Sequence, residues 1–137
     1  MKYSLKQFPI FSGLSQDEIR NIEDFCQEKE LSFWEYLFHE GDEPQALYIL
    51  ASWTLWVLKW VDKLELAVIE PGSLIGEMAF FWDEKVRNAS IVAKENSELI
   101  VILAFSLVQL FWKYPELKAK FDAIIEERNE LNKSKGF

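Results

Sequence analysis

The chain has 137 residues, half of them hydrophobic, a length that allows one domain with a hydrophobic core but not two domains of ordinary size. Its formal net charge of −8 argues against nucleic-acid binding through a basic face, because phosphate contacts dominate that affinity. No apolar run reaches the roughly 20 residues that span a bilayer, and the N-terminus MKYSLKQFPIF lacks signal-peptide features, so we expect a cytoplasmic protein without a membrane partner.

Residues 1–30 are expected to form an N-terminal helical segment. Ser15 is a suitable N-cap and Glu18 stands three residues later as its capping-box partner. An apolar face at helical spacing follows, made of Ile19, Ile22, Phe25 and Cys26. Cys26 is the single cysteine, so it cannot form an internal disulfide, and we interpret it as a small buried hydrophobic residue.

Residues 31–104 are predicted to be strands. Short segments rich in β-branched and aromatic residues alternate with turns that contain Gly, Pro and Asp. The segments are LSFWEYLF, ALYILA, WTLWVLKWV, LELAVIE, NASIVAKE and SELIVILA. This even spacing predicts about six to eight strands in a sandwich or barrel, and therefore a mainly β fold with flanking helices.

Residues 105–137 return to a helical period. Ser106 is expected to cap the first of these helices and Pro115 to separate it from the next. The second helix carries an apolar stripe of Leu117, Phe121, Ile124 and Ile125. Without a linker or an internal repeat, we expect residues 1–137 to form a single domain.

The stretch GEMAFFWDEKVRNAS, residues 76–90, combines groups that suit an anionic, hydroxylated ligand. A carboxylate such as Glu77 accepts hydrogen bonds from hydroxyls, and a guanidinium such as Arg87 binds phosphate. The backbone after Gly76 can open a short helical turn whose free N–H groups form an anion cradle. Alternatively, Glu77 and Arg87 pair with each other on the surface, a contact worth only about 0 to 1 kcal/mol.

Catalytic and metal-binding chemistry is not indicated. His39 is the only histidine, and it stands in a turn without a cysteine or second histidine to share a metal. We interpret it as a surface residue. No Ser/His/Asp or Cys/His set is present, so we expect no enzyme activity and no cofactor.

Five ordered motifs carry a resemblance to a known family: FPIFSGLS, FHEGDEPQALYIL, EPGSLIGEMAFF, VRNASIVA and YPEL. With these motifs, nearly the whole chain resembles the cyclic nucleotide-binding domain family. The resemblance implies a double-stranded β-helix, a jelly-roll-like β-roll with an N-terminal helix, C-terminal helices and a phosphate-binding cassette at residues 76–90. It also implies a cyclic nucleotide, cAMP or cGMP, as the ligand.

The resemblance further implies roles for the cassette residues. Gly76 and Glu77 would close the ribose side, with Glu77 accepting the 2′-hydroxyl, and Arg87 would pair with the cyclic phosphate. The other implied contacts are the backbone N–H of Ala89, the flanking Asn88 and Ser90, and Met78 with Ala79 at the start of the cassette helix. The last helix, near Phe121 to Ile125, would cover the base. Asn88 is not the hydroxyl residue that often favours guanine, which favours cAMP.

Six tryptophans set this chain apart. Trp34 and Trp53 stand where the family usually has glycine at strand turns, and a bulky residue at positive φ is strained. Trp82 lies inside the cassette. If Leu55 and Val57 face the interior, the opposite surface of that strand consists of Trp56, Leu58 and Trp60. Such a stripe is either a contact surface or is covered by the terminal helices.

Two functions follow. In the first, the chain is a cyclic nucleotide sensor that signals through movement of its C-terminal helix to a second copy or another protein. In the second, it is a non-binding or engineered variant of the fold, acting as a self-associating or partner-binding scaffold through its tryptophan-rich surface.

Overall fold

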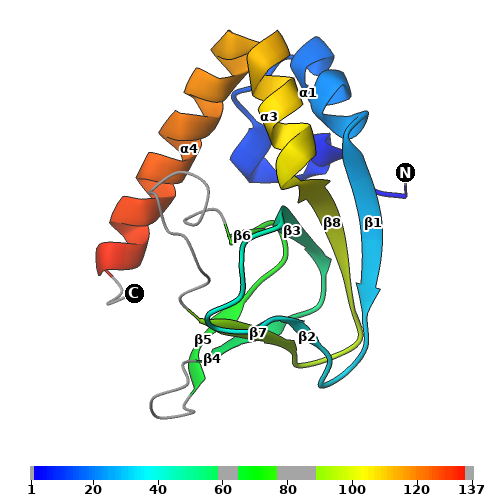
Figure 1. Ribbon diagram of the computed structural model, residues 1–137, viewed down its shortest axis with the longest axis vertical. Coiled ribbons are helices and arrows are strands. Elements are labelled where there is room, and N and C mark those ends of the chain that lie inside the picture. Colours follow the sequence, from blue (N-terminus) through cyan, green and yellow to red (C-terminus); the bar gives the residue numbers. More distant parts are fainter. Residues whose placement is uncertain (1, 59–64, 77–88, 135–137) are drawn as a thin grey trace.

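The structure is a computed structural model that describes residues 2–58, 65–76 and 89–134. Two layers of antiparallel strands form a roll, and the helices gather at one end of it (Figure 1). The helical elements are η1 (Leu5–Gln7), η2 (Pro9–Phe11), α1 (Gln16–Glu23), α3 (Ala104–Lys113) and α4 (Pro115–Ser134). The strands are β1 (Cys26–Leu31), β2 (Tyr36–Phe38), β3 (Ala46–Ser52), β4 (Leu55–Leu58), β5 (Glu65–Ile69), β6 (Leu74–Ile75), β7 (Ser90–Ala93) and β8 (Ser97–Leu103).

The strands form two four-stranded sheets. The first sheet has the order β1-β8-β3-β6 and the second has the order β2-β7-β4-β5. Every strand pair within the described residues is antiparallel. The expected fold class, a β-roll with an N-terminal helix and C-terminal helices, is confirmed.

Strand β3 separates two hydrophobic clusters, because its side chains alternate between the faces of the first sheet. Leu47 and Ile49 belong to the cluster shared with the helices, whereas Leu50 belongs to the cluster between the two sheets. The alternating sequence ALYILAS therefore supplies both cores from one strand. The same alternation in β4 turns Leu55 and Val57 toward the cluster between the sheets.

Helix α1 has the predicted start but an earlier end. The Ser15 Oγ accepts from the Glu18 N–H at 3.1 Å, and the Glu18 carboxylate accepts from the Ser15 N–H at 2.9 Å, which confirms the capping box. The helix ends at Glu23, and β1 begins at Cys26, so the expected boundary at residue 31 was wrong. The polar sequence CQEKEL gives little strand signal, and the β1 backbone pairs along its length with β8.

Helix α3 starts two residues before the predicted cap. Its N-cap is Leu103, which makes no side-chain capping bond, so the assignment of Ser106 as the cap was wrong. Helix α3 directly continues β8, and the Ala104 N–H donates instead to the Gln45 carbonyl at 2.9 Å. Pro115 begins α4, and the predicted apolar stripe of α4 is buried at Leu117, Phe121 and Ile125.

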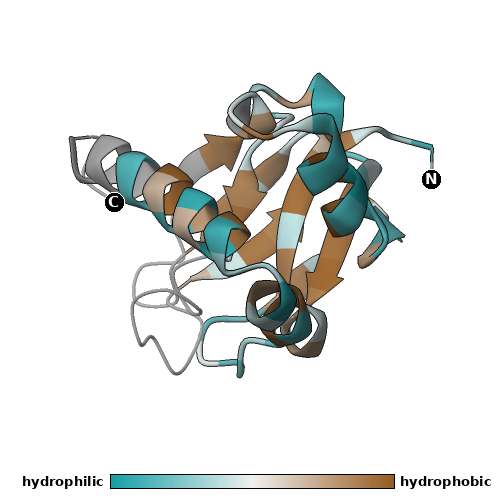
Figure 2. Ribbon diagram, turned by 90° about the horizontal axis from the view of Figure 1, so that it is seen from above, coloured by the Kyte–Doolittle hydropathy of each residue, from teal (hydrophilic) through white to brown (hydrophobic). Residues whose placement is uncertain are grey.

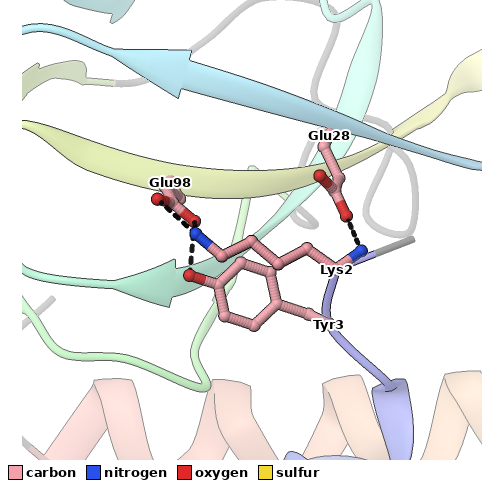
Figure 3. Close-up of polar contacts among 4 residues, drawn as sticks. All are labelled: Lys2, Tyr3, Glu28 and Glu98. Atoms are coloured by element: carbon pink, nitrogen blue, oxygen red, sulfur yellow. Dashed lines mark hydrogen bonds and ion pairs between the residues drawn. The ribbon is translucent and has the colours of Figure 1, made fainter.

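The first residues are held against the first sheet by Glu98 of β8 (Figure 3). The Lys2 Nζ donates to the Glu98 carboxylate at 3.0 Å, and the Tyr3 hydroxyl donates to the same carboxylate. The Lys2 N–H also donates to Glu28 of β1. The Tyr3 and Lys2 hydrogen bonds lower the pKa of Glu98 below its ordinary value.

Among the described residues, none of the helices combines the length and the apolarity needed to cross a membrane.

Candidate functional site

The predicted ligand segment connects the two sheets. Its first residue, Gly76, follows β6 at the edge of the first sheet, and its last residue, Ser90, begins β7 inside the second sheet. Gly76, Ala89 and Ser90 are among the described residues. The remaining predicted contacts, Glu77, Met78, Ala79, Arg87 and Asn88, lie outside them, as do Trp60 and Trp82. Their assigned roles stay predictions.

Gly76 marks a change of backbone direction directly after a buried strand. Leu74 and Ile75 are buried and pair with Ile49 and Tyr48 of β3. Gly76 then takes φ 80°, in the left-handed region that glycine adopts without a steric penalty. A side chain with a Cβ would be strained here, so the glycine at the start of the segment has a structural reason.

At the other end, β7 anchors the segment in the middle of the second sheet. Ala89 is buried, and Ile91, Val92 and Ala93 continue the buried run between β2 and β4. Strand β7 is paired on both sides, and Ala89 directly precedes it. The role of the Ala89 N–H as a donor stays a prediction.

The Ser90 hydroxyl has a partner that the sequence did not reveal. The Glu40 N–H, in the turn between β2 and β3, donates to the Ser90 Oγ at 2.8 Å. Ser90 therefore links the end of the ligand segment to that turn, and its hydroxyl hydrogen remains able to donate to a further acceptor. Residues 40 and 90 are far apart in sequence, and no local motif predicts such a contact.

The turn that supplies this N–H is ordered by its own side chains. The His39 N–H donates to Asp42 Oδ2 at 2.8 Å, and the His39 ring stacks on Tyr36 with centroids 4.2 Å apart. Gly41 has φ 91° at the tip of the turn. The His39 side chain is exposed, which confirms its interpretation as a surface residue.

The cluster between the sheets gives the site apolar surroundings. It contains Ile75 next to Gly76 and Ile91 next to Ser90, together with the half-buried Phe38 and Tyr48, whose ring centroids lie 6.1 Å apart. Electrostatic contacts strengthen in such low-dielectric surroundings. An arginine and phosphate pair placed beside this cluster would be stronger than the same pair in water.

The predicted lid residues pack in the helical cluster in this structure. Phe121 and Ile125 belong to the helical cluster, and the Phe121 ring lies 5.9 Å from Phe11 and 5.4 Å from Phe111. Lys120 Nζ donates to Glu18 Oε1 at 2.6 Å, which ties α4 to α1. The structure thus holds this part of α4 on the N-terminal helices, and its role over a base stays a prediction.

The predicted tryptophan interface is only half exposed. Trp56 and Leu58 are half-buried, the ring of Trp34 lies 4.9 Å from that of Trp56, and Lys94 Nζ lies 5.8 Å from the Trp56 centroid. The exposed aromatic side chains at this end are Phe33, Tyr36, Trp34 and Trp53 instead, the last two at φ 68° and 71°. The predicted strain at Trp34 and Trp53 is therefore present.

Metal and thiol chemistry have no support in the described part of the chain. No group of three or more His, Cys, Asp or Glu side chains there could hold a metal ion. Burial raises the pKa of Cys26 to about 12, and its Sγ donates to the Ile22 carbonyl at 3.3 Å. A thiol with that pKa is protonated at neutral pH and is a poor nucleophile.

The chain is similar in sequence to cyclic nucleotide-binding domains and to proteins that match it over most of its length. The family description "Cyclic nucleotide-binding domain" matches residues 28–114. The cyclic AMP receptor protein of Thermus thermophilus is 30% identical over 127 residues, which cover 90% of this chain and 58% of that protein. The human voltage-gated delayed rectifier potassium channel KCNH8 is 29% identical over 131 residues, which cover 95% of this chain and 12% of the channel.

A solved structure supports the fold. A cyclic nucleotide-binding domain from Methylobacillus flagellatus KT superposes with a TM-score of 0.83 at 23% identity, covering 96% of this chain and 75% of that chain. The chain thus spans 58% of the length of the bacterial relative and 12% of that of the channel.

Proposed function

Because the chain belongs to the cyclic nucleotide-binding domain family, we propose that it binds a cyclic nucleotide, with cAMP preferred over cGMP. The observation that carries the proposal is the family match across residues 28–114, which includes the whole segment 76–90. The two ends of that segment support it, since Gly76 adopts a positive φ that glycine permits and Ala89 is buried next to β7.

In this proposal, Arg87 and Glu77 contact different parts of the ligand. Arg87 pairs with the cyclic phosphate, because a guanidinium forms two parallel hydrogen bonds with phosphate oxygens. Glu77 accepts the 2′-hydroxyl, and the Ala89 N–H donates to the phosphate. We assign the chain a regulatory role and no catalytic one.

Helix α4 carries the signal in this proposal. Its first half is held on α1 by Lys120 and Glu18 and on η2 and α3 by Phe121. A displacement of α4 upon ligand binding would therefore also disturb its contacts with the N-terminal helices α1 and η2. Amide hydrogen exchange of α1 and α4, measured with and without cAMP, would detect this movement.

A calorimetric titration tests the binding proposal. Protein that has been unfolded and refolded to remove any carried-over ligand is titrated with cAMP and then with cGMP. We expect saturable binding, tighter for cAMP, and an Arg87→Ala variant that binds about 30-fold or more weakly, since truncating one partner of a desolvated charge pair costs about 2 to 5 kcal/mol. No heat with either nucleotide, from protein shown to be folded, would overturn the proposal.

Arg20→Ala is the matched control for the loss of a guanidinium. Arg20 lies on α1, its side chain is exposed, and its Nη1 is 4.0 Å from Asp17. This variant removes the same charge from a surface remote in sequence from the ligand segment. Its affinity for cAMP should equal that of the unmodified chain.

The exposed aromatic side chains at the turns favour a second candidate function, a scaffold that associates through this end of the roll. Trp34 and Trp53 are 56 and 60% exposed. Under this alternative, Trp34→Lys and Trp53→Lys should abolish assembly and leave the monomer folded, because both side chains are exposed, whereas Arg87→Ala should leave assembly unchanged. Variants that only unfold the chain would count against the scaffold.

A further inference from the structure

Helix α3 is apolar on two opposite faces. Leu107 and Leu110 are buried against the helical cluster. On the opposite face, Phe105, Val108 and Trp112 are 72, 68 and 87% exposed. Residues at i, i+3 and i+7 share one face of a helix, so these three side chains form a continuous stripe, which we call the α3 stripe.

The α3 stripe carries no charge. From Ala104 to Trp112 the only polar side chains of the helix are Ser106 and Gln109, and Lys113 is its single charged residue. Figure 2 shows the α3 ribbon largely in the hydrophobic colour, whereas α1 is largely hydrophilic. A helix that is hydrophobic all round is normally buried all round, but the described residues of the chain cover only one face of α3.

The size of the stripe suits a second copy of the same chain. Together with Leu103 at the N-cap, the exposed parts of these side chains amount to roughly 500 Å² of apolar surface. A two-fold contact uses the same stripe on both copies and would bury about 1,000 Å², which reaches the lower limit of specific interfaces.

The charges at the two ends of α3 are complementary in an antiparallel pairing. Lys113 ends the helix. The turn that contains Asp42 and Glu43 lies near its start, since Gln45 accepts the hydrogen bond of the Ala104 N–H at 2.9 Å. Asp42 and Glu43 are exposed. In an antiparallel pair, Lys113 of each copy would face this acidic turn of the other.

We propose that the chain forms a homodimer in which the α3 helices of two copies pack antiparallel through the α3 stripe. Val108 lies near the two-fold axis, and Phe105 of each copy packs against Trp112 of the other. The contact uses none of the residues of segment 76–90, so it is independent of the proposed nucleotide binding.

Sedimentation equilibrium of the full chain over a concentration series tests the dimer. The unmodified chain should sediment as a monomer and dimer in equilibrium. Val108→Glu and, separately, Phe105→Glu should weaken the dimer about 30-fold or more, because each buries a charge in an apolar contact. Both side chains are exposed in the monomer, so circular dichroism should show an unchanged fold.

Two controls define the surface. Phe33→Glu adds the same charge to an exposed aromatic position at the opposite end of the roll and should leave the dimer intact. Lys113→Glu should weaken the dimer, and Glu43→Lys in the same chain should restore it, because the exchanged charges still face each other. If Lys113 only stabilised its own monomer, Glu43→Lys would not restore the dimer.

Either of two results would overturn the proposal. A chain that is monomeric at every concentration would mean that the stripe is covered by another protein or by nothing. A dimer that survives Val108→Glu and Phe105→Glu, or that Phe33→Glu also dissociates, would place the contact elsewhere.

Discussion

The end of the roll that carries the helices differs in packing and backbone strain from the opposite end, which carries the turns of Trp34 and Trp53 and which we call the turn end. At the helical end, Phe11 and Phe121 are fully buried and contact each other, and α1 starts with a complete capping box. At the turn end, Trp34 and Trp53 are more than half exposed and have positive φ. The helical end thus has a well-packed core and a relaxed backbone beside the exposed α3 stripe, whereas the turn end combines exposed aromatic side chains with a strained backbone.

A comparison with the glycine turns of the same roll shows that the strain comes from a Cβ at positive φ. Gly41 and Gly72 both have φ 91°, where they carry no Cβ to clash with the backbone. Trp34 and Trp53 adopt the same half of conformational space with a Cβ, at a cost of roughly 1 to 2 kcal/mol each. Hydrogen bonds hold the strained turns, including that from the Trp34 N–H to the Ala93 carbonyl at 2.9 Å.

The largest effect expected from this comparison is at Phe121. Phe121→Ala should lower the free energy of unfolding by about 3 to 5 kcal/mol, because it removes a fully buried ring and leaves a cavity against Phe11 and Phe111. Urea denaturation measures the change. Phe33→Ala, at an exposed aromatic position of the turn end, should change stability by less than about 0.5 kcal/mol. Equal losses at the two sites would contradict the distinction between the ends.

A smaller change, of opposite sign, is expected at the turn end. Trp53→Gly should raise the free energy of unfolding by about 0.5 to 1 kcal/mol. Removing the Cβ at φ 71° relieves backbone strain, and the greater conformational entropy of glycine in the unfolded chain offsets part of this gain. Trp53→Ala is the control, since it removes the indole and keeps the Cβ. If both variants have the same melting temperature, backbone strain is not the cause.

Peptide mass mapping of positions 34 and 53, in protein from its source cells, accompanies that experiment. The family resemblance leads us to expect glycine at both positions, and the backbone at both is one that glycine adopts freely. The sequence has tryptophan at both positions. If the peptides showed glycine there instead, glycine would account for both positive φ values.

The sequence predicted the elements with strong local signals. The capping box at Ser15, the start of α4 at Pro115 and the alternation in β3 are all local patterns, and the structure has each of them. It missed β1, because the polar sequence CQEKEL forms a strand through pairing with β8 and not through its own periodicity. It also misplaced the start of α3, where β8 continues into the helix without a capping side chain.

The candidate site was predicted only in part, for a related reason. Gly76 was expected from its motif, and its positive φ gives the physical cause. The hydrogen bond from the Glu40 N–H to Ser90 depends on two turns that meet only in the folded roll. The exposed face of α3 was not predicted. The periodicity of LVQLFWKY does not show which of its two apolar faces the chain covers.

The smallest effect expected is a pH dependence at the helical end. Hydrogen bonds from Lys120 and from the Ser15 backbone lower the pKa of Glu18 below its ordinary value of 4.5. A carboxylate whose pKa is lower in the folded state stabilises the fold above pH 4.5, and this contribution is lost as the pH falls through the folded-state pKa. The pair is near the surface, so the contribution should be below about 1 kcal/mol.

Lys120→Met should therefore lower the melting temperature at about pH 6 and have a smaller effect at a pH below the folded-state pKa of Glu18, where the carboxylate is protonated. Lys118→Met is the control on the same helix, because Lys118 pairs with Asp122 within α4, Nζ to Oδ2 2.8 Å, and does not join α4 to α1. A Lys120→Met loss that is the same at both pH values would show that the methylene stem of Lys120, and not its charge, stabilises the contact between the helices.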